Sequence, residues 1–318
     1  MPGLGYGVAF LIALGGLAFN IGNIGGAAMG LNIIFGIDTT MGAAISGIIG
    51  ILLFAFKKMG GVLDTTAKLL GVVMLVLIAY VACVTNPPVG EAVSHVLMPD
   101  QIPWLATVTL IGGTVGGYIT FSGGHRLIDA GVTGIEHLKD VRRAAFMGLS
   151  VDALVRILLF LAVLGVISMG FTLDAKNPAG SAFLLGAGQV GHLIFGLVFF
   201  CAALTSVVGA AYTSVSFLKT LFKVVEKYEK LTIMAFIFIS TCILIGLGKP
   251  AALLIVAGSL NGLILPITLA VMLVATHKKE IVGTYKHNRL LYWAGWIVVL
   301  VTAYMGITSL QGMSKLLG

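Results

Sequence analysis

The sequence predicts an all-α polytopic membrane protein, and three observations support this fold class. Hydrophobic residues make up 58% of the 318-residue chain, charged residues make up only 10%, and the mean hydropathy is +1.09. Nine segments are as long and as apolar as a bilayer span, which takes about 20 residues, and short loops join them. One of these spans carries glycines through its middle. We therefore expect a single transmembrane domain over residues 1–318.

The expected spans follow one another along the whole chain. In order, they cover residues 4–35, 39–56, 66–84, 103–130, 142–171, 180–217, 231–248, 250–276 and 289–310. Cys83, Cys201 and Cys242 all lie inside spans, where cysteine behaves as a small apolar residue. We therefore expect neither a disulfide nor a metal cluster.

Lysine and arginine predict how the spans are oriented. Most of these residues lie in four loops. The exceptions are Arg156 inside a span, and Lys176, Lys249 and Lys315 in the alternate loops and the C-terminal segment. The four loops lie near residues 57–68, 126–143, 219–230 and 278–289. The positive-inside rule places them in the cytoplasm, so we expect an inner-membrane protein with a cytoplasmic N-terminus and an external C-terminus. The net charge of +7 then belongs to the membrane surface and not to a nucleic-acid partner.

The span at 103–130 is not expected to be a continuous helix. Its middle holds Gly112, Gly113, Gly116 and Gly117, and each interior glycine costs about 1 kcal/mol of helix propensity against alanine. Glycine-interrupted spans are typical of secondary transporters, because unwound backbone is tolerated in a membrane only where it lines a cavity. Close helix packing through small residues is the alternative explanation.

Two polar pairs inside spans are further candidates for function. Asn20 and Asn23 share a face of the first helix, which either lines a central pathway or joins helices through amide hydrogen bonds. Asp152 and Arg156 are four residues apart, which is good spacing for an ion pair. That pair is either structural or part of an ion or proton pathway.

Two single residues complete the candidates. His125 follows the glycine break toward its cytoplasmic end, where we expect it to line an inner vestibule. Asn261 lies among Gly258, Gly262 and Pro266, which predict a second helix irregularity. Its amide oxygen suits either an ion ligand or a helix-packing role.

The distribution of spans around the glycine break predicts missing helices. From the break onward there are five spans, 103–130 to 250–276, and one more, whereas only three precede it. Many transporters consist of two inverted repeats, so on that plan the first repeat lacks two helices. We expect an N-terminally truncated chain, and a genuine nine-helix protein is the alternative.

Sequence motifs of enzymes and ATP-driven pumps are absent from the chain. It contains no GxxxxGK[ST] phosphate loop, no HExxH, no CxxC and no nucleophile elbow. We therefore expect neither an enzyme nor a bound cofactor.

Several stretches resemble the NRAMP (natural-resistance-associated macrophage protein) family of divalent-metal transporters. NIGNIGGAAMGLNIIFGID at 20–38 and the segment at 57–84, with Asp64 near its start, are similar to that family's third to fifth helices. LIGGTVGGYITFSGG at 110–124 is similar to its sixth helix, and the segment around Asn261 to its tenth. The resemblance implies a LeuT-like inverted-repeat fold of eleven helices, of which nine are present. Residues 1–84 then end the first repeat, 103–276 form the second, and 289–310 form an extra helix.

The family's functional residues carry over with departures. Its first-helix DPGN motif is absent, its sixth-helix MPH motif falls on Gly116, Gly117 and Tyr118, and its tenth-helix glutamine on Asn261. The family's acidic pair, which serves proton movement, corresponds here to Asn20 and Asn23, and their amides cannot titrate. We expect metal to be bound by Thr114, Gly116, Gly117, Tyr118 and Asn261, and the pathway to be lined by Asn20, Asn23, His125, Asp152 and Arg156.

These departures predict the substrate class. Loss of the soft methionine ligand favours a hard cation such as Mg²⁺, with Mn²⁺ and Fe²⁺ as the other members of the class. We expect a secondary transporter of divalent cations, weakly or not proton-coupled, whose partners are the metal ion and the lipid bilayer, with the oligomeric state left open. The alternatives are a LeuT-fold carrier of an organic solute such as an amino acid, and a truncated remnant that transports nothing.

Overall fold

The computed structural model describes residues 2–56 and 59–317, and every regular element in these residues is a helix. The side chains of residues 1–2, 57–68, 129 and 311–318 lie outside the described part of the chain, and Asp64 is among them. The chain divides into two compact units, which are described separately. The first unit consists of Met1–Asn23, Pro103–Ile135 and Val207–Gly318, and the second of Ile24–Ile102 and Glu136–Ser206. The helices α1 (Pro2–Phe35) and α8 (Pro178–Leu221) contribute to both.

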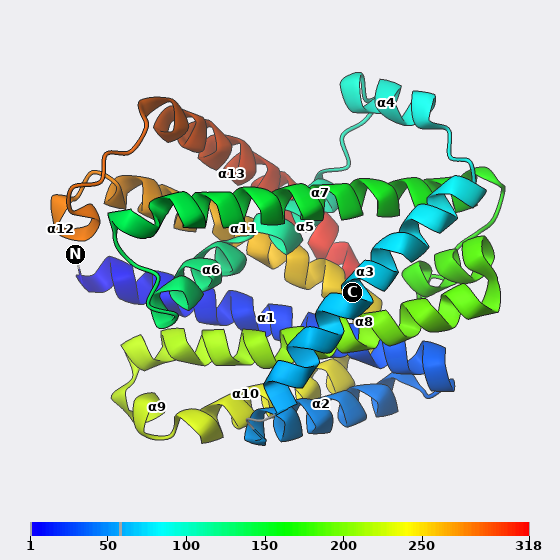
Figure 1. Cartoon of the computed structure of the whole chain (residues 1–318), viewed down its shortest axis with the longest axis horizontal. Helices are drawn as coiled ribbons and strands as arrows, with labels where there is room; N and C mark the ends of the chain where they lie inside the picture. The colour runs from blue at the N-terminus through cyan, green and yellow to red at the C-terminus, as the bar shows by residue number, and fades with distance from the viewer. Residues whose placement is uncertain (1, 57–58, 318) are drawn as a thin grey trace. The chain divides into compact units, whose positions relative to one another are not determined.

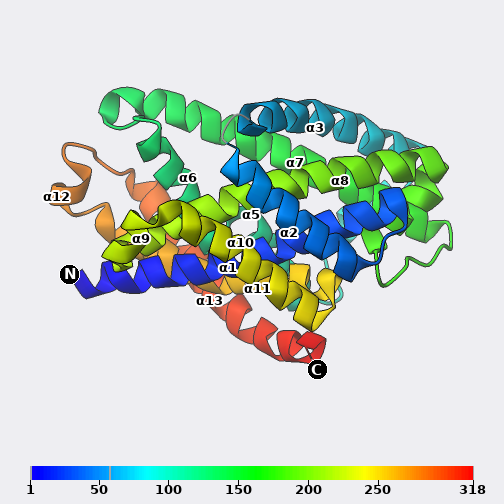
Figure 2. The same ribbon diagram turned by 90° about the horizontal axis from the view of Figure 1, so that it is seen from below.

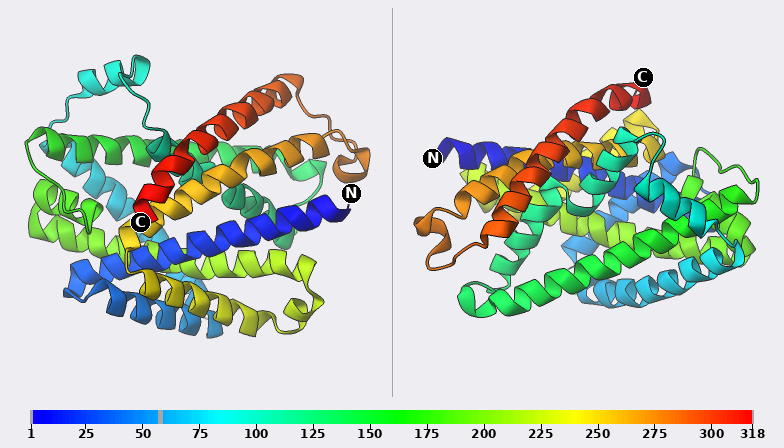
Figure 3. Two further views of the ribbon diagram at one scale, coloured as in Figure 1. Left: turned by 180° about the vertical axis from the view of Figure 1, so that it is seen from behind. Right: turned by 90° about the horizontal axis from the view of Figure 1, so that it is seen from above.

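The first unit is built around α11. Besides its parts of α1 and α8, it contains α5 (Trp104–Val115), α6 (Gly117–Asp129), α9 (Lys223–Lys227), α10 (Glu229–Leu247), α11 (Pro250–Ala275), α12 (Lys279–Val282) and α13 (Arg289–Leu317) (Figure 1). α11 packs against α5, α6 and α13, and Figure 3 shows α11 and α13 side by side.

Local sequence explains the sharp turn into α11. Gly248 ends α10 in the left-handed conformation, with φ of 64°, which glycine adopts without steric cost. Pro250 then begins α11, where its missing N–H would have no helical acceptor in any case.

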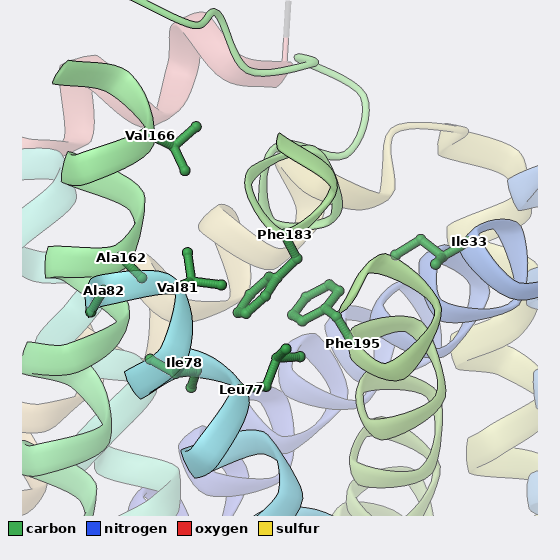
Figure 4. Packing of buried hydrophobic residues seen from close by; sticks show 9 residues of the cluster. All are labelled: Ile33, Leu77, Ile78, Val81, Ala82, Ala162, Val166, Phe183 and Phe195. Carbon is green, nitrogen blue, oxygen red and sulfur yellow. The ribbon is translucent and has the colours of Figure 1, made fainter. Parts of the chain in front are cut away.

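The second unit has its own apolar core. It contains α2 (Thr39–Ala55), α3 (Met59–Val84), α4 (Val89–Leu97) and α7 (Leu138–Ser168), with the short η1 (Ile135–His137) at its boundary. Phe183 stacks on Phe195 with ring centroids 4.4 Å apart, and both pack with apolar side chains of α3 and α7 such as Val81 and Val166 (Figure 4). Asp38 accepts a hydrogen bond from the backbone N–H of Thr40 and so caps α2. This contact lowers the pKa of the Asp38 carboxyl.

Each of the nine expected spans contains a helix. In the described part of the chain, seven are long and apolar enough to cross a bilayer alone, counting α5 and α6 as one broken span. α3 meets the length criterion together with α4, from which it is bent by 102°, and α2 is shorter.

Two features of the helices differ from expectation. α11 runs unbroken through Gly258, Gly262 and Pro266, so the predicted second irregularity is wrong. The two glycines admit the backbone of α5 instead: a Cβ at Gly258 would lie 2.8 Å from the carbonyl oxygen of Thr109. An unpredicted kink occurs in α8 at Gly188, where φ is 66° and ψ is −168°, a conformation available in practice only to glycine.

Candidate functional site

The glycine-rich span is broken, as the sequence predicts, and the structure places the break at Gly116. α5 ends at Val115 and α6 begins at Gly117, while Gly116 between them has φ of −54° and a non-helical ψ of 163°. Figure 2 labels α5 and α6 as separate helices. Non-glycine residues adopt this backbone conformation as well. The requirement for glycine is therefore steric, and it comes from the neighbours of the break.

Close contact with α11 explains the small residues. A Cβ on Gly112 would lie 1.8 Å from the carbonyl oxygen of Gly258, and one on Gly116 would lie 2.7 Å from Cβ of Asn261. A Cβ on Gly117 would lie 2.5 Å from a methyl group of Ile264. Close packing therefore explains the glycines on the face of the span that contacts α11. The same span is also broken, so both interpretations of the glycines apply.

Asn261 is fully buried beside the break. Its Nδ2 donates hydrogen bonds to the carbonyl oxygens of Gly15, 3.2 Å away, and Ala257, 3.0 Å away. Its Oδ1 has no hydrogen-bond partner among the described residues, and it lies 2.9 Å from where a Cβ on Gly15 would be. A buried acceptor without a donor costs about 1–3 kcal/mol, so this oxygen is the clearest unsatisfied group at the break.

The start of α6 adds backbone donors. The first helical bond of α6 runs from the N–H of Thr120 to the carbonyl oxygen of Gly116 at 3.0 Å, so the N–H groups of Gly117, Tyr118 and Ile119 precede it and have no acceptor within the helix. Among the described side chains none caps this end. The Thr120 hydroxyl donates to the carbonyl oxygen of Val115, 2.9 Å away, across the break.

Thr114 and Tyr118 are less available than the sequence predicts. The Thr114 hydroxyl donates to the carbonyl oxygen of Leu110 within α5. The Tyr118 side chain is buried, and its hydroxyl donates to the carbonyl oxygen of Ala210 on α8, 3.2 Å away. The structure therefore brings Gly116, Gly117 and Asn261 together, whereas the Tyr118 hydroxyl is directed to α8.

The asparagines of α1 contact a different element. Nδ2 of the buried Asn20 donates to the Ser240 hydroxyl on α10 at 3.1 Å, and Ser240 in turn donates to the carbonyl oxygen of Phe236. Oδ1 of Asn20 and Nδ2 of Asn23 are buried without a partner among the described residues. Both the helix-joining and the pathway interpretations of this face remain predictions.

His125 and the charged pair lie in different units. In the first unit, Nε2 of His125 is 2.5 Å from the Ser216 hydroxyl of α8. In the second unit, Nε of Arg156 donates to Oδ2 of Asp152 at 2.8 Å, so the expected ion pair is present on α7. Its side chains are about 40% exposed, and its role in a pathway stays a prediction.

Some residues near the break could not be identified as part of the site from the sequence alone. The Gly15 carbonyl that accepts from Asn261, and Gly16, where a Cβ would lie 1.9 Å from the Ser214 hydroxyl, are recognisable only once α1 is placed. No group of three or more His, Cys, Asp and Glu side chains in the described residues is arranged to hold a metal ion. The ligands that the chain offers at the break are therefore amide, hydroxyl and backbone groups.

These features define a class: a multi-pass helical membrane protein whose α5–α6 span is broken in its middle, as in LeuT-like transporters. The chain belongs to the Nramp family, since the model of that family, described as natural resistance-associated macrophage protein-like, matches residues 3–311. It is 53% identical over 310 residues to the uncharacterized membrane protein YcsG of Bacillus subtilis, covering 98% of this chain and 77% of that protein. It is also 53% identical over 304 residues to an uncharacterized membrane protein of Haemophilus influenzae, covering 96% of this chain and 77% of that protein.

Solved structures confirm the fold. Two mutants of the manganese transporter of Eremococcus coleocola superpose with TM-scores of 0.68 and 0.69 at 16% identity, each covering 98% of this chain and 72% of that chain. At this identity the likeness extends to the fold alone. The family and the all-helical LeuT-like fold that the sequence predicts are thus confirmed.

Proposed function

We propose that this chain acts in secondary transport of divalent metal cations, with its substrate site at the α5–α6 break beside Asn261. The observation that carries the proposal is the buried Oδ1 of Asn261, which has no hydrogen-bond donor among the described residues. Hard cations such as Mg²⁺ bind amide and carbonyl oxygens and often retain several waters. Membership of the Nramp family and the likeness to structures named as manganese transporters support the same class.

The proposed ion is hard, and proton coupling is weak or absent. Gly116 and Gly117 supply no soft ligand, and the amides of Asn20 and Asn23 exchange no proton near neutral pH. Transport then proceeds by alternating access, in which α5, α6 and α11 move against a scaffold that includes α1 and α8. The proposed location is the cytoplasmic membrane, with the N-terminus inside and the C-terminus outside.

Ligand-dependent stability of the purified protein tests the site. A ligand that binds only the folded state at a hundred times its Kd stabilises that state by about 2.7 kcal/mol. We expect Mg²⁺ or Mn²⁺ to raise the apparent Tm of the wild type, and Asn261→Ala to lose most of that increase. Gln189→Ala, at an exposed position of α8, is the control that retains it. An equal increase in the wild type and in Asn261→Ala would place the ion elsewhere.

A small organic carboxylate is the second candidate substrate, and the uncapped start of α6 favours it. Free N–H groups at a helix N-terminus attract anions, and the break lies among neutral residues. Asn261→Asp separates the two candidates, because it keeps the size of the side chain, adds a negative charge that a bound cation would balance, and gives up the donated bonds to Gly15 and Ala257. Cation binding should survive or tighten in this variant, whereas carboxylate binding should be lost.

A further inference from the structure

The helix α4 is amphipathic, and its apolar face lies open. The apolar residues recur at the i, i+4, i+7 and i+8 spacing of one helix face, namely Val89, Val93, Val96 and Leu97. Glu91 and His95 lie on the opposite face. The structure describes the whole of α4, and none of its residues is buried. Val96 and Leu97 are 78% and 76% exposed. A continuous exposed apolar face of this kind marks an interaction surface.

The turn between α3 and α4 is fixed by local sequence. The two helices are bent by 102° from each other, and Figure 1 shows α4 leaving the line of α3. Thr85 follows α3 and is buried against α7, where a Cβ on Gly165 would overlap the Thr85 hydroxyl. Asn86 has φ of 45°, and Pro87 and Pro88 then lack the N–H groups that would continue a helix. α4 therefore runs across the direction of α3 and not onward along it.

Both ends of this segment lie where a bilayer span ends. α3 occupies the expected span at 66–84 and carries exposed apolar side chains such as Val76. Residues 98–103 join α4 to α5, which begins at Trp104. The Trp104 ring meets Tyr304 of α13 edge-on, with centroids 5.6 Å apart, and tryptophan and tyrosine concentrate at the membrane–water interface. With nine residues, α4 is too short to cross a bilayer, so it belongs at the surface where α3 ends.

The charges of the segment favour an apolar contact. Between residues 85 and 103 the charged residues are Glu91 and Asp100, and the sequence there contains no lysine or arginine. Nε2 of His95 lies 3.5 Å from Oδ2 of Asp100, and both side chains are well exposed. These groups form a polar edge suited to water. A segment without basic residues gains nothing from anionic headgroups, so the apolar face supplies the attraction to lipid.

We propose that α4 is an interfacial helix whose partner is the bilayer that surrounds α3 and α5. Its apolar face enters the boundary between headgroups and acyl chains by about 5–10 Å, while Glu91 stays in water. The helix thereby anchors the chain just before the broken α5–α6 span. This inference concerns the lipid alone and does not depend on what the chain transports.

Spin-label accessibility in phosphatidylcholine vesicles tests the position of α4. Labels are placed at Val93→Cys or at Glu91→Cys, both exposed positions, in a chain whose Cys83, Cys201 and Cys242 are replaced by serine. We expect the ratio of relaxation by oxygen to relaxation by a water-soluble nickel chelate to be several-fold higher at Val93→Cys. Nickel reaching both labels equally would overturn the proposal by placing α4 in water, and oxygen reaching both equally would make α4 re-entrant. A Val93→Cys label shielded from both reagents would also overturn it, because protein, such as a second copy of the chain, would then cover the face.

A negative charge on each face supplies the matched control. Val96→Glu should raise nickel accessibility at the Val93→Cys label several-fold, because a carboxylate on the apolar face lifts the helix toward water. Ser94→Glu, outside that face, should leave it unchanged. Neither substitution should shift the Tm in detergent, because no residue of α4 is buried. Replacing part of the phosphatidylcholine by phosphatidylglycerol should not increase the protection of the label. Protection that requires phosphatidylglycerol, or that persists undiminished in Val96→Glu, would contradict the apolar contact.

Discussion

At the residue scale, single atoms decide which glycines are required. Gly112 and Gly113 are neighbours in α5, but only Gly112 faces α11, where a Cβ would overlap the backbone of Gly258 and Gly262. Overpacking typically costs about 1–3 kcal/mol. Gly112→Ala should therefore lower the apparent Tm of the purified protein by several degrees. Gly113→Ala should leave it unchanged or higher, because its Cβ meets nothing within 4 Å and alanine favours the helix by up to about 1 kcal/mol. Equal effects of the two substitutions would refute the close contact between α5 and α11.

The amide of Asn20 gives a second prediction at this scale. Ser240→Ala removes the acceptor for Nδ2 of Asn20 and leaves the whole buried amide unpaired, which should cost about 1–3 kcal/mol. Adding Asn20→Leu removes the unpaired amide and should restore most of that stability. If Asn20 also lines the pathway, the double variant should be stable in thermal unfolding yet slow in flux. Failure of the second substitution to restore stability would show that the amide has partners beyond Ser240.

At the scale of the element, the break in the α5–α6 span is the central feature. A Cβ at Gly116 would lie 2.2 Å from the carbonyl oxygen of Gly112 and would also press on Asn261. Gly116→Ala should therefore displace Asn261 from the break and reduce cation flux by about tenfold or more, which is about 1.4 kcal/mol or more in activation free energy. Gly123→Ala, in the same half-helix with open space around its Cβ, is the control and should transport as the wild type does. Unchanged flux in Gly116→Ala would show that the substrate does not depend on the geometry at Asn261.

The helices also show how far the sequence predicts the structure. A break in the α5–α6 span was predictable because several glycines coincide in the middle of an apolar span, whereas its position at Gly116 comes from the structure. The kink at Gly188 was not predictable, since a single glycine within a helix is usually tolerated and does not by itself predict a positive φ. The continuity of α11 was mispredicted because Gly258 and Gly262 look like breakers in sequence, yet they serve close approach of α5. Asn261 was found from its setting among glycines, whereas its bond to the Gly15 carbonyl depends on a backbone group that no side chain marks.

At the scale of the whole molecule, the proposal requires cation movement without stoichiometric proton movement. The described part of the first unit places amides, hydroxyls and backbone groups at the break, and no cluster of carboxylates or imidazoles among the described residues surrounds it. Divalent cations that enter a proteoliposome should therefore not acidify its lumen by a matching amount. A pH-sensitive dye in the lumen measures this. One proton carried per cation would contradict the neutral pathway.

Uptake of Mg²⁺ and Mn²⁺ by proteoliposomes holding the purified protein tests the central claim most directly. A metal-sensitive dye in the lumen reports the flux, with Asn261→Asp and Asn261→Ala measured beside the wild type. The proposal predicts saturable cation entry that Asn261→Asp retains and Asn261→Ala loses. Absence of cation entry in the wild type, together with entry of a small carboxylate that Asn261→Asp abolishes, would contradict it and establish the organic-anion alternative.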